Sequence, residues 1–215
     1  MMTKIPQHLQ PKLAKTGELF QNTILEKLTR TSIYIPLVMH TLIASIFLYY
    51  AVANTPISYM MILALFFLGW LTWTFAEYSI HRWFYHATIN SRWLKKIQYM
   101  GHGIHHSYPK DAERLAMPPL PALILIMLFF SIFYMIGDIY AVAFFPGFLI
   151  GYVVYIGLHY AQHIYKVPKL TLFKKLWKYH ALHHYKYPET KVFGVSTLLW
   201  DHVFGTLPDQ QKKSI

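Results

Sequence analysis

Histidine side chains gather in four short motifs of this sequence. The motifs are HRWFYH, HGIHH, HYAQH and HALHH. Imidazole binds zinc, copper, iron and nickel, and ten imidazoles exceed what one ion can use. The chain has no cysteine, so thiolate ligands are excluded. The sequence therefore predicts a two-metal centre made almost entirely of histidine. The motifs contain ten of the thirteen histidines, namely His81, His86, His102, His105, His106, His159, His163, His180, His183 and His184.

The spacing within three motifs is helical. His102, His105 and His106 stand at i, i+3 and i+4, which lie on one face of a helix, and HALHH repeats that spacing. The two histidines of HYAQH are four residues apart, again on one face. His81 and His86 are five apart, roughly 140° around an ideal helix. This pair needs a helix end, a bulge or two different metal ions.

The remaining three histidines have ordinary explanations. His8 lies in a polar N-terminal stretch and His40 lies inside an apolar run, so we interpret both as structural residues. His202 follows Asp201 in the sequence DHVFGT. Asp201 could orient a ligand imidazole, as outer carboxylates do at metal sites, or cap a helix.

Ligand type alone does not select the metal. Zinc has no redox chemistry, so a zinc pair would imply hydrolysis or a structural role. Hydrolytic pairs normally bring bridging carboxylates, and only nine acidic residues occur in the chain. An all-histidine site better suits iron working on dioxygen, although zinc could replace iron in preparations. Aromatic neighbours of the motifs, such as Trp83 and Tyr179, would shape a dry slot for an apolar substrate or anchor the chain at an interface.

The elements that must position these motifs are apolar. The chain is 55% hydrophobic and 13% charged, which is typical of a membrane protein. Four apolar runs cover 33–53, 57–75, 120–136 and 139–158, each close to the ~20 residues that cross a bilayer as a helix. The breaks between the first two and the last two are short. The sequence therefore predicts an all-α fold of two transmembrane hairpins.

The basic residues predict the orientation of these hairpins. The net charge is +11, and all twenty Lys and Arg precede the first hairpin, lie between the hairpins or follow the second. By the positive-inside rule both termini and the histidine motifs are cytosolic. The positive charge thus indicates contact with a membrane surface and not with nucleic acid. A soluble helical bundle is the weaker alternative for the fold. Apolar residues from Leu19 to Leu28 recur at helical spacing, which suits a short interfacial or surface helix.

From about Glu77 to Leu207 the sequence resembles the membrane fatty acid hydroxylase superfamily. The histidine motifs mark the wider superfamily, whereas RLAMPP, HALHHYKY, FGVST and the WD and VFGT elements around His202 resemble the fatty acid 2-hydroxylases. The resemblance implies four transmembrane helices capped by a cytosolic helical domain, with all ten motif histidines as ligands of a di-iron centre. It implies dioxygen-dependent hydroxylation at carbon 2 of a long-chain fatty acid or a sphingolipid acyl chain.

Two departures from the family pattern qualify the resemblance. Many members carry an N-terminal haem domain of the b5 type, and no HPGG motif occurs here, so we expect electrons from a separate b5-type protein or ferredoxin. Family members often have Glu where this chain has His202.

We divide the chain into an N-terminal cytosolic or interfacial segment (1–32), the hydroxylase domain (33–207) and a tail (208–215). The expected location is the endoplasmic reticulum in a eukaryote or the cytoplasmic membrane in a bacterium.

Other functions stay open at this point. Oxidation of sterols, carotenoids or aldehydes, or desaturation, would use the same histidine motifs. A metal transporter would place ligands and acids within its membrane crossings. Here the motifs lie to one side of the apolar runs. The runs themselves contain almost no ionisable residue apart from His40. A structural zinc protein is a further alternative.

Overall fold

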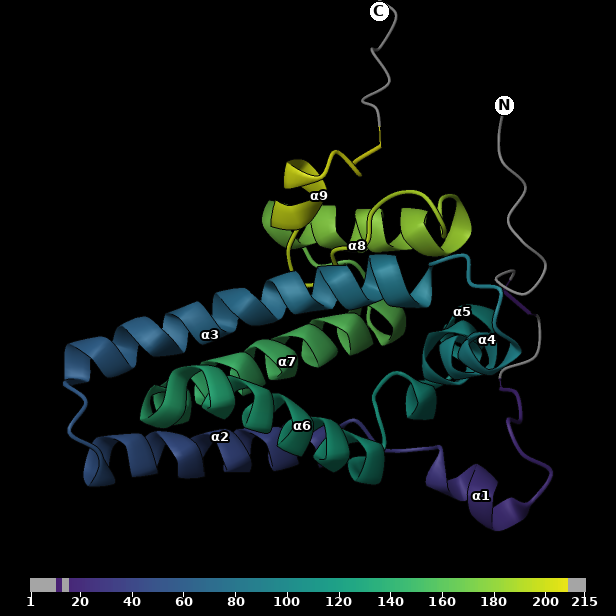
Figure 1. Cartoon of the computed structure of the whole chain (residues 1–215). Helices are drawn as coiled ribbons and strands as arrows, with labels where there is room; N and C mark the ends of the chain where they lie inside the picture. The colour runs from purple at the N-terminus through teal and green to yellow at the C-terminus, as the bar shows by residue number, and fades with distance from the viewer. Residues whose placement is uncertain (1–10, 13–15, 209–215) are drawn as a thin grey trace, which may run out of the picture.

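The computed structural model describes residues 11–12 and 16–208, so His8 and the tail from 209 onward lie outside it (Figure 1). Four long helices dominate the described part, in which no β-strand occurs. They are α2 (Tyr34–Asn54), α3 (Tyr59–Ser79), α6 (Pro119–Gly137) and α7 (Ala141–Ile164). Five shorter α-helices accompany them: α1 (Thr23–Leu28), α4 (Arg92–Gln98), α5 (Ile104–Ser107), α8 (Thr171–Tyr185) and α9 (Leu199–Val203).

The long helices form two hairpins, as the sequence predicts. The first turn contains Pro56, and the side chain of Ser58 caps α3 by accepting a hydrogen bond from the Met61 amide. In the second turn α6 ends at Gly137, and Asp138 adopts a φ of 48°, which redirects the chain through the 3-10 turn η5 (Asp138–Tyr140) into α7. Both turns lie at the same end of the bundle (Figure 1).

Three stretches are long and apolar enough to cross a membrane: 34–54, 59–85 and 112–164. The third contains both α6 and α7. Large apolar side chains such as Met135 and Ile136 are 86% and 80% exposed, as expected for surfaces that face lipid. The predicted all-α fold with apolar membrane helices is confirmed for the described residues. The number of crossings stays a prediction.

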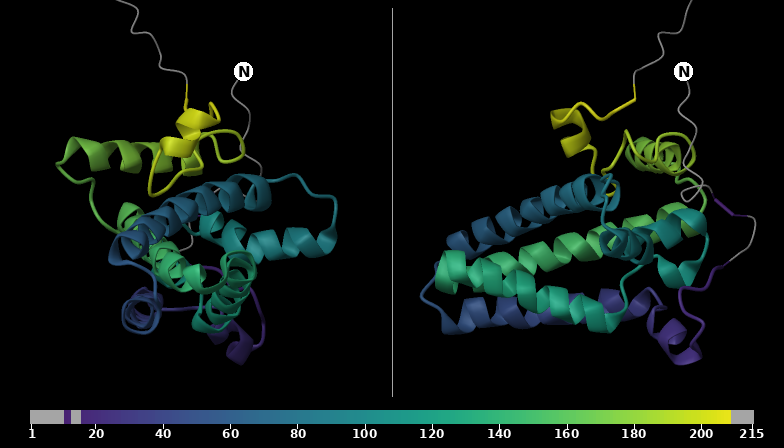
Figure 2. Two further views of the ribbon diagram at one scale, coloured as in Figure 1. Left: turned by 60° about the vertical axis from the view of Figure 1, so that its left-hand side comes forward. Right: turned by 45° about the vertical axis from the view of Figure 1, so that its right-hand side comes forward.

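Helix α7 is the central helix of the bundle and packs against both α2 and α3 (Figures 1 and 2). Glycines let the backbones of α3 and α7 approach closely. A Cβ atom on Gly69 would lie 2.0 Å from the Phe144 carbonyl oxygen, and one on Gly147 would lie 1.8 Å from the Phe66 carbonyl oxygen. Since α3 and α7 both continue into histidine motifs, this tight contact fixes the relative position of those motifs.

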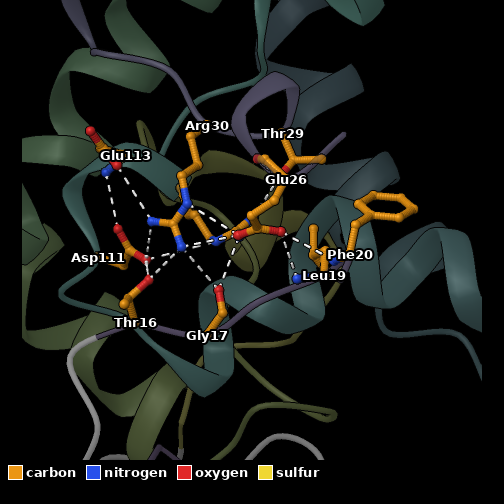
Figure 3. A network of polar contacts seen from close by, with 10 residues as sticks. Thr16, Gly17, Leu19, Phe20, Glu26, Thr29, Arg30, Asp111 and Glu113 are labelled. Atoms are coloured by element: carbon orange, nitrogen blue, oxygen red, sulfur yellow. Dashed lines mark hydrogen bonds and ion pairs between the residues drawn. The ribbon is translucent and has the colours of Figure 1, made fainter. Parts of the chain in front are cut away.

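The short helices α1, α4 and α5 gather at the end opposite the hairpin turns, and α8 and α9 lie beside the C-terminal part of α3 (Figures 1 and 2). Together they form a cap of short helices, and the expected cytosolic position of this cap stays a prediction. The N-terminal segment is attached to this cap by Arg30, which forms ion pairs with Glu26 at 3.1 Å, Asp111 at 3.4 Å and Glu113 at 3.4 Å (Figure 3). Arg114, which is buried, pairs with the same Glu26 carboxylate.

Candidate metal centre

The ten motif histidines form two groups of five in space. Within each group one ring nitrogen per histidine lies within 4.8 Å of the corresponding atoms of the others. Group A consists of His81, His86, His102, His106 and His183. Group B consists of His105, His159, His163, His180 and His184. All ten predicted residues are therefore brought together, and they are divided equally between the two groups.

A π-helix brings His81 and His86 into the same group. Helix α3 passes directly into the π-helix η2 (Ile80–Tyr85), and the His86 amide donates to the His81 carbonyl at 3.2 Å, an i to i+5 bond. The wider π turn brings residues five apart onto nearly the same face, and such turns recur at functional sites. Of the options raised by the sequence, a local bulge in the helix is the one observed.

Each HxxHH motif contributes to both groups. In HGIHH, His102 and His106 belong to group A and His105 belongs to group B. In HALHH, His180 and His184 belong to group B and the intervening His183 belongs to group A. The i, i+4 pair therefore serves one group and the i+3 residue the other. Both HxxHH motifs therefore lie between the two groups and supply ligands to each.

The spacing of the ring nitrogens fits metal ligands. In group A the Nε2 atom of His102 lies 2.9 Å from that of His81 and 2.9 Å from that of His106. In group B the Nε2 atom of His105 lies 3.0 Å from that of His159 and 3.2 Å from that of His184. Two nitrogens about 2.1 Å from one ion and at right angles to each other lie about 3 Å apart.

Tautomers support the same interpretation. His81 Nδ1 lies 2.5 Å from the Phe193 carbonyl oxygen, and His159 Nδ1 lies 3.3 Å from the Leu115 carbonyl oxygen. A carbonyl accepts a proton only from a protonated Nδ1, so the Nε2 atom of each ring carries a lone pair toward its group. A metal ion within each group would accept such a lone pair. The residues present therefore fit a pair of metal ions.

Burial keeps the imidazoles in the form that binds metal. Eight of the ten candidate ligands, all except His86 and His163, are buried, and His106, His183 and His184 are at 0% exposure. Burial, and next to it the charge of neighbouring imidazoles, holds the pKa of His102 and His105 well below the ordinary value. The same holds for His106, His180, His183 and His184. Neutral imidazole is the metal-binding form.

The other two histidines of the described residues, His40 and His202, belong to neither group. His40 is buried in α2 and donates from Nδ1 to the Pro36 carbonyl at 2.7 Å, a structural role as the sequence suggested. His202 is exposed on α9. His8 lies outside the described residues. Asp201 is fully buried and accepts hydrogen bonds from the loop after α8. Of the two roles that the sequence leaves open for it, direct orientation of a ligand imidazole is not observed.

A largely apolar cavity of about 550 Å³ opens beside both groups. Its walls include His81 and His102 of group A and His105 and His159 of group B. From there it extends between the long helices toward a deep end lined by apolar and aromatic side chains, among them Ile126, Phe129, Phe145 and Phe148. Near the cap it is lined by polar groups of Thr29 and Arg114. The volume lies within the range of about 300–1,000 Å³ for small-molecule sites.

Fold and site together define a helical membrane protein with two all-histidine groups, each able to hold a metal ion. A family model described as "Fatty acid hydroxylase" matches residues 66–206, about two thirds of the chain. The chain belongs to the fatty acid hydroxylase family. The resemblance inferred from the histidine motifs is therefore confirmed.

Several characterised proteins are similar over most of this chain. Dihydroceramide fatty acyl 2-hydroxylase FAH2 of Arabidopsis thaliana is 35% identical over 93% of this chain and 84% of its own length. Fatty acid 2-hydroxylase of Mus musculus is 33% identical over 95% of this chain, which spans 60% of the mouse protein. Among solved structures, that of scs7p, in which only the hydroxylase domain is visible, has a TM-score of 0.85 and 34% identity, covering 94% of this chain and 76% of that one.

Proposed function

We propose that this chain is a membrane fatty acid 2-hydroxylase, which hydroxylates carbon 2 of a long-chain fatty acid or of a sphingolipid acyl chain. The observation that carries the proposal is the position of the two histidine groups at the polar end of a deep apolar cavity. Relatives that are named as fatty acid and dihydroceramide fatty acyl 2-hydroxylases support the position and the substrate class.

The ten histidines are the proposed ligands of two iron ions. When bound, an iron pair supplies the redox chemistry that activates dioxygen for insertion into a C–H bond. One oxygen atom of dioxygen enters that bond and the other leaves as water, while an external donor of the b5 or ferredoxin type provides two electrons and solvent provides two protons. Iron is favoured over zinc because zinc has no redox chemistry. The buried walls of the cavity exclude water from the reacting carbon.

The cavity orients the acyl chain. Its deep end between α6 and α7 is lined by aromatic side chains such as Phe129 and Phe148, which suit a hydrocarbon tail. Arg114 and Thr29 line it near the cap, and Leu115, the residue after Arg114, contacts His159 of group B through its carbonyl oxygen. A polar acyl head beside Arg114 would therefore place carbon 2, which adjoins the carbonyl carbon, next to the histidines. The methyl end of the chain would lie in the deep end of the cavity.

The distribution of basic residues supports a cytosolic site. The hairpin turns carry no Lys or Arg, whereas the segments that contain the short helices carry all the basic residues of the described chain. We infer that α6 and α7 cross separately, giving four crossings, and that both histidine groups and the termini face the cytosol. The membrane would be the endoplasmic reticulum in a eukaryote or the cytoplasmic membrane in a bacterium.

Lipid analysis of cells tests the proposal. The chain is expressed in a host that makes no 2-hydroxyacyl lipids, beside His105→Ala, His106→Ala and the control His202→Ala, which changes an exposed histidine outside both groups. We expect 2-hydroxyacyl lipids from the wild type and the control and none from the two group variants. A changed sterol or carotenoid profile without 2-hydroxyacyl lipids would overturn the proposal in favour of another lipid oxidation.

A further inference from the structure

The loop that connects α8 to α9 covers group A. The ring of Phe193, which is 2% exposed, lies 5.8 Å from His81, 5.8 Å from His86 and 5.7 Å from His183, measured between ring centroids. Within the described residues no comparable ring contact joins Phe193 to a group B histidine. The segment 191–196, hereafter the covering loop, is therefore associated with only one of the two groups.

Two carbonyl oxygens of the covering loop orient two imidazoles of group A. His81 Nδ1 donates to the Phe193 carbonyl at 2.5 Å, and His183 Nδ1 lies 3.3 Å from the Lys191 carbonyl. A carbonyl partner at Nδ1 fixes the ring orientation and leaves Nε2 free for the metal. Among the described residues of group B, the Leu115 carbonyl plays the corresponding role at His159, and it comes from a different segment of the chain.

The covering loop contains one residue in an unfavourable backbone conformation, which accompanies the orientation of its two carbonyl groups toward group A. Val192, between the two carbonyl-bearing residues, has a φ of 63°. The left-handed region is a genuine outlier for a β-branched residue and costs free energy, so surrounding contacts must maintain it. The left-handed residue lets the carbonyls of Lys191 and Phe193 both face group A, and the Val192 amide donates to the Thr206 carbonyl at 3.0 Å.

Two buried carboxylates maintain the rest of the loop. Asp201, at 0% exposure, accepts from the amides of Phe193 at 2.9 Å and Gly194 at 2.8 Å. Glu77, near the end of α3, accepts from the amides of Val195 at 2.7 Å and Ser196 at 2.9 Å. Four consecutive loop amides thus donate to two carboxylates, and neither carboxylate contacts a candidate ligand directly.

We propose that Glu77 and Asp201 are positioning residues for the metal ion of group A alone: they hold the covering loop so that its carbonyls fix His81 and His183. This inference rests on the proposed function for its two metal ions. It assigns a role to the segments FGVST and WDHVFGT, which the histidine pattern leaves unexplained. It also predicts that the two ions depend differently on the same pair of carboxylates.

Metal binding, measured without turnover, tests the proposal. Protein purified in detergent and stripped of metal is titrated with Co²⁺, with bound metal and the visible spectrum as readouts. Wild type should bind about two ions. Asp201→Asn should weaken the binding of one ion about 10–100-fold, the cost typical of an outer-shell partner. The Asn side chain has only one oxygen, so its NH₂ group would point at the backbone N–H of Phe193 or Gly194, which is also a donor.

Glu77 offers a conservative pair of variants. Glu77→Ala removes both acceptors and should weaken one ion about 10–100-fold. Glu77→Gln should stay within about threefold of wild type, because the amide oxygen can still accept from Val195 and Ser196 while its NH₂ donates to the Ser196 hydroxyl. The control Thr74→Val removes the buried acceptor of Trp200 Nε1 without touching the covering loop, and should leave both affinities unchanged.

Single-group backgrounds assign the weakened ion. In His184→Ala, where only group A remains complete, Asp201→Asn should lower Co²⁺ affinity about 10–100-fold. In His106→Ala, where only group B remains complete, it should change nothing. Equal weakening in both backgrounds, or a Glu77→Gln loss equal to that of Glu77→Ala, would overturn the inference. A wild type that binds two ions as expected and makes no 2-hydroxyacyl lipid would overturn only the proposed function.

Discussion

His105 and His106 are consecutive in the chain, yet their imidazoles belong to different groups of five. His105 Nε2 lies 3.0 Å from His159 Nε2, whereas His106 Nε2 lies 2.9 Å from His102 Nε2. The short helix α5 therefore passes between the two candidate metal sites and ties them together. Such coupling favours a reaction that needs both ions at a fixed separation over two independent structural sites.

This arrangement predicts separable losses of metal. His105→Ala should remove the group B ion and His106→Ala the group A ion, so each single variant should hold about one ion per chain and the double variant none. Each single variant should lose at least about 100-fold in activity, since removing a ligand exceeds the 10–100-fold effect of an outer-shell change. Elemental analysis of protein purified without chelators measures this, with His202→Ala as the control. Two ions retained in either single variant would contradict the division into groups.

The histidine motifs predicted the ligand set but could not predict its division. Helical spacing shows only that His102, His105 and His106 share one broad face, and which part of that face meets which group depends on where α7 and α8 lie. The five-residue spacing of His81 and His86 raises a bulge as one of three options but cannot select it, because a π turn leaves no mark in the pattern of apolar residues. Helix α7 continues to Ile164 and so carries both histidines of HYAQH within its last turns.

The covering loop marks the limit of reasoning from residue types. Val192 is β-branched, and its type disfavours the left-handed conformation that it adopts. Glu77 is one of nine acidic residues in the chain, and nothing in its sequence neighbours indicates a contact with Val195, 118 positions away. By contrast, the apolar runs predicted α2, α3, α6 and α7, because their length and composition alone define them.

Close packing of α3 on α7 predicts a strong effect of small substitutions. Gly147→Ala would place a Cβ atom 1.8 Å from the Phe66 carbonyl oxygen, so the helices must separate. We expect a loss of about 1–3 kcal/mol, seen as a lower thermal midpoint in detergent. Gly157→Ala is the matched control in the same helix, because its Cβ atom would meet nothing within 4 Å. Equal midpoints for the two variants would show that α3 and α7 do not touch at Gly147.

Acid should destabilise the metal-free protein. Burial, followed by neighbouring imidazoles, holds the pKa of His102, His106 and His184 well below the ordinary value of 6.5. The unfolded chain therefore binds more protons than the folded chain as pH falls through 6.5, and the free energy of unfolding falls in that direction. Each such histidine contributes up to about 1.4 kcal/mol per pH unit. Thermal midpoints at pH 7.5, 6.5 and 5.5 after chelation measure this, and a midpoint that is constant or rises with acid would contradict it.

The ion pairs of Arg30 predict how the N-terminal segment protects the cavity. Leu19, Leu28 and Thr29 line the cavity, and Arg30 joins their segment to Asp111 and Glu113 (Figure 3). Arg30→Ala should therefore loosen residues 16–30. Amide hydrogen exchange there should accelerate about tenfold, which corresponds to about 1.4 kcal/mol and to the loss of one hydrogen bond to a charged group.

The control for Arg30 is Lys27→Ala, which removes an exposed cation of the same segment that makes none of these ion pairs. Exchange in this variant should match the wild type, and exchange within α7 should be unchanged in both. If Arg30→Ala exchanges like Lys27→Ala across residues 16–30, the ion pairs do not hold the segment. If α7 accelerates as well, the effect is general destabilisation, and the cavity is closed by the fold as a whole rather than by this attachment.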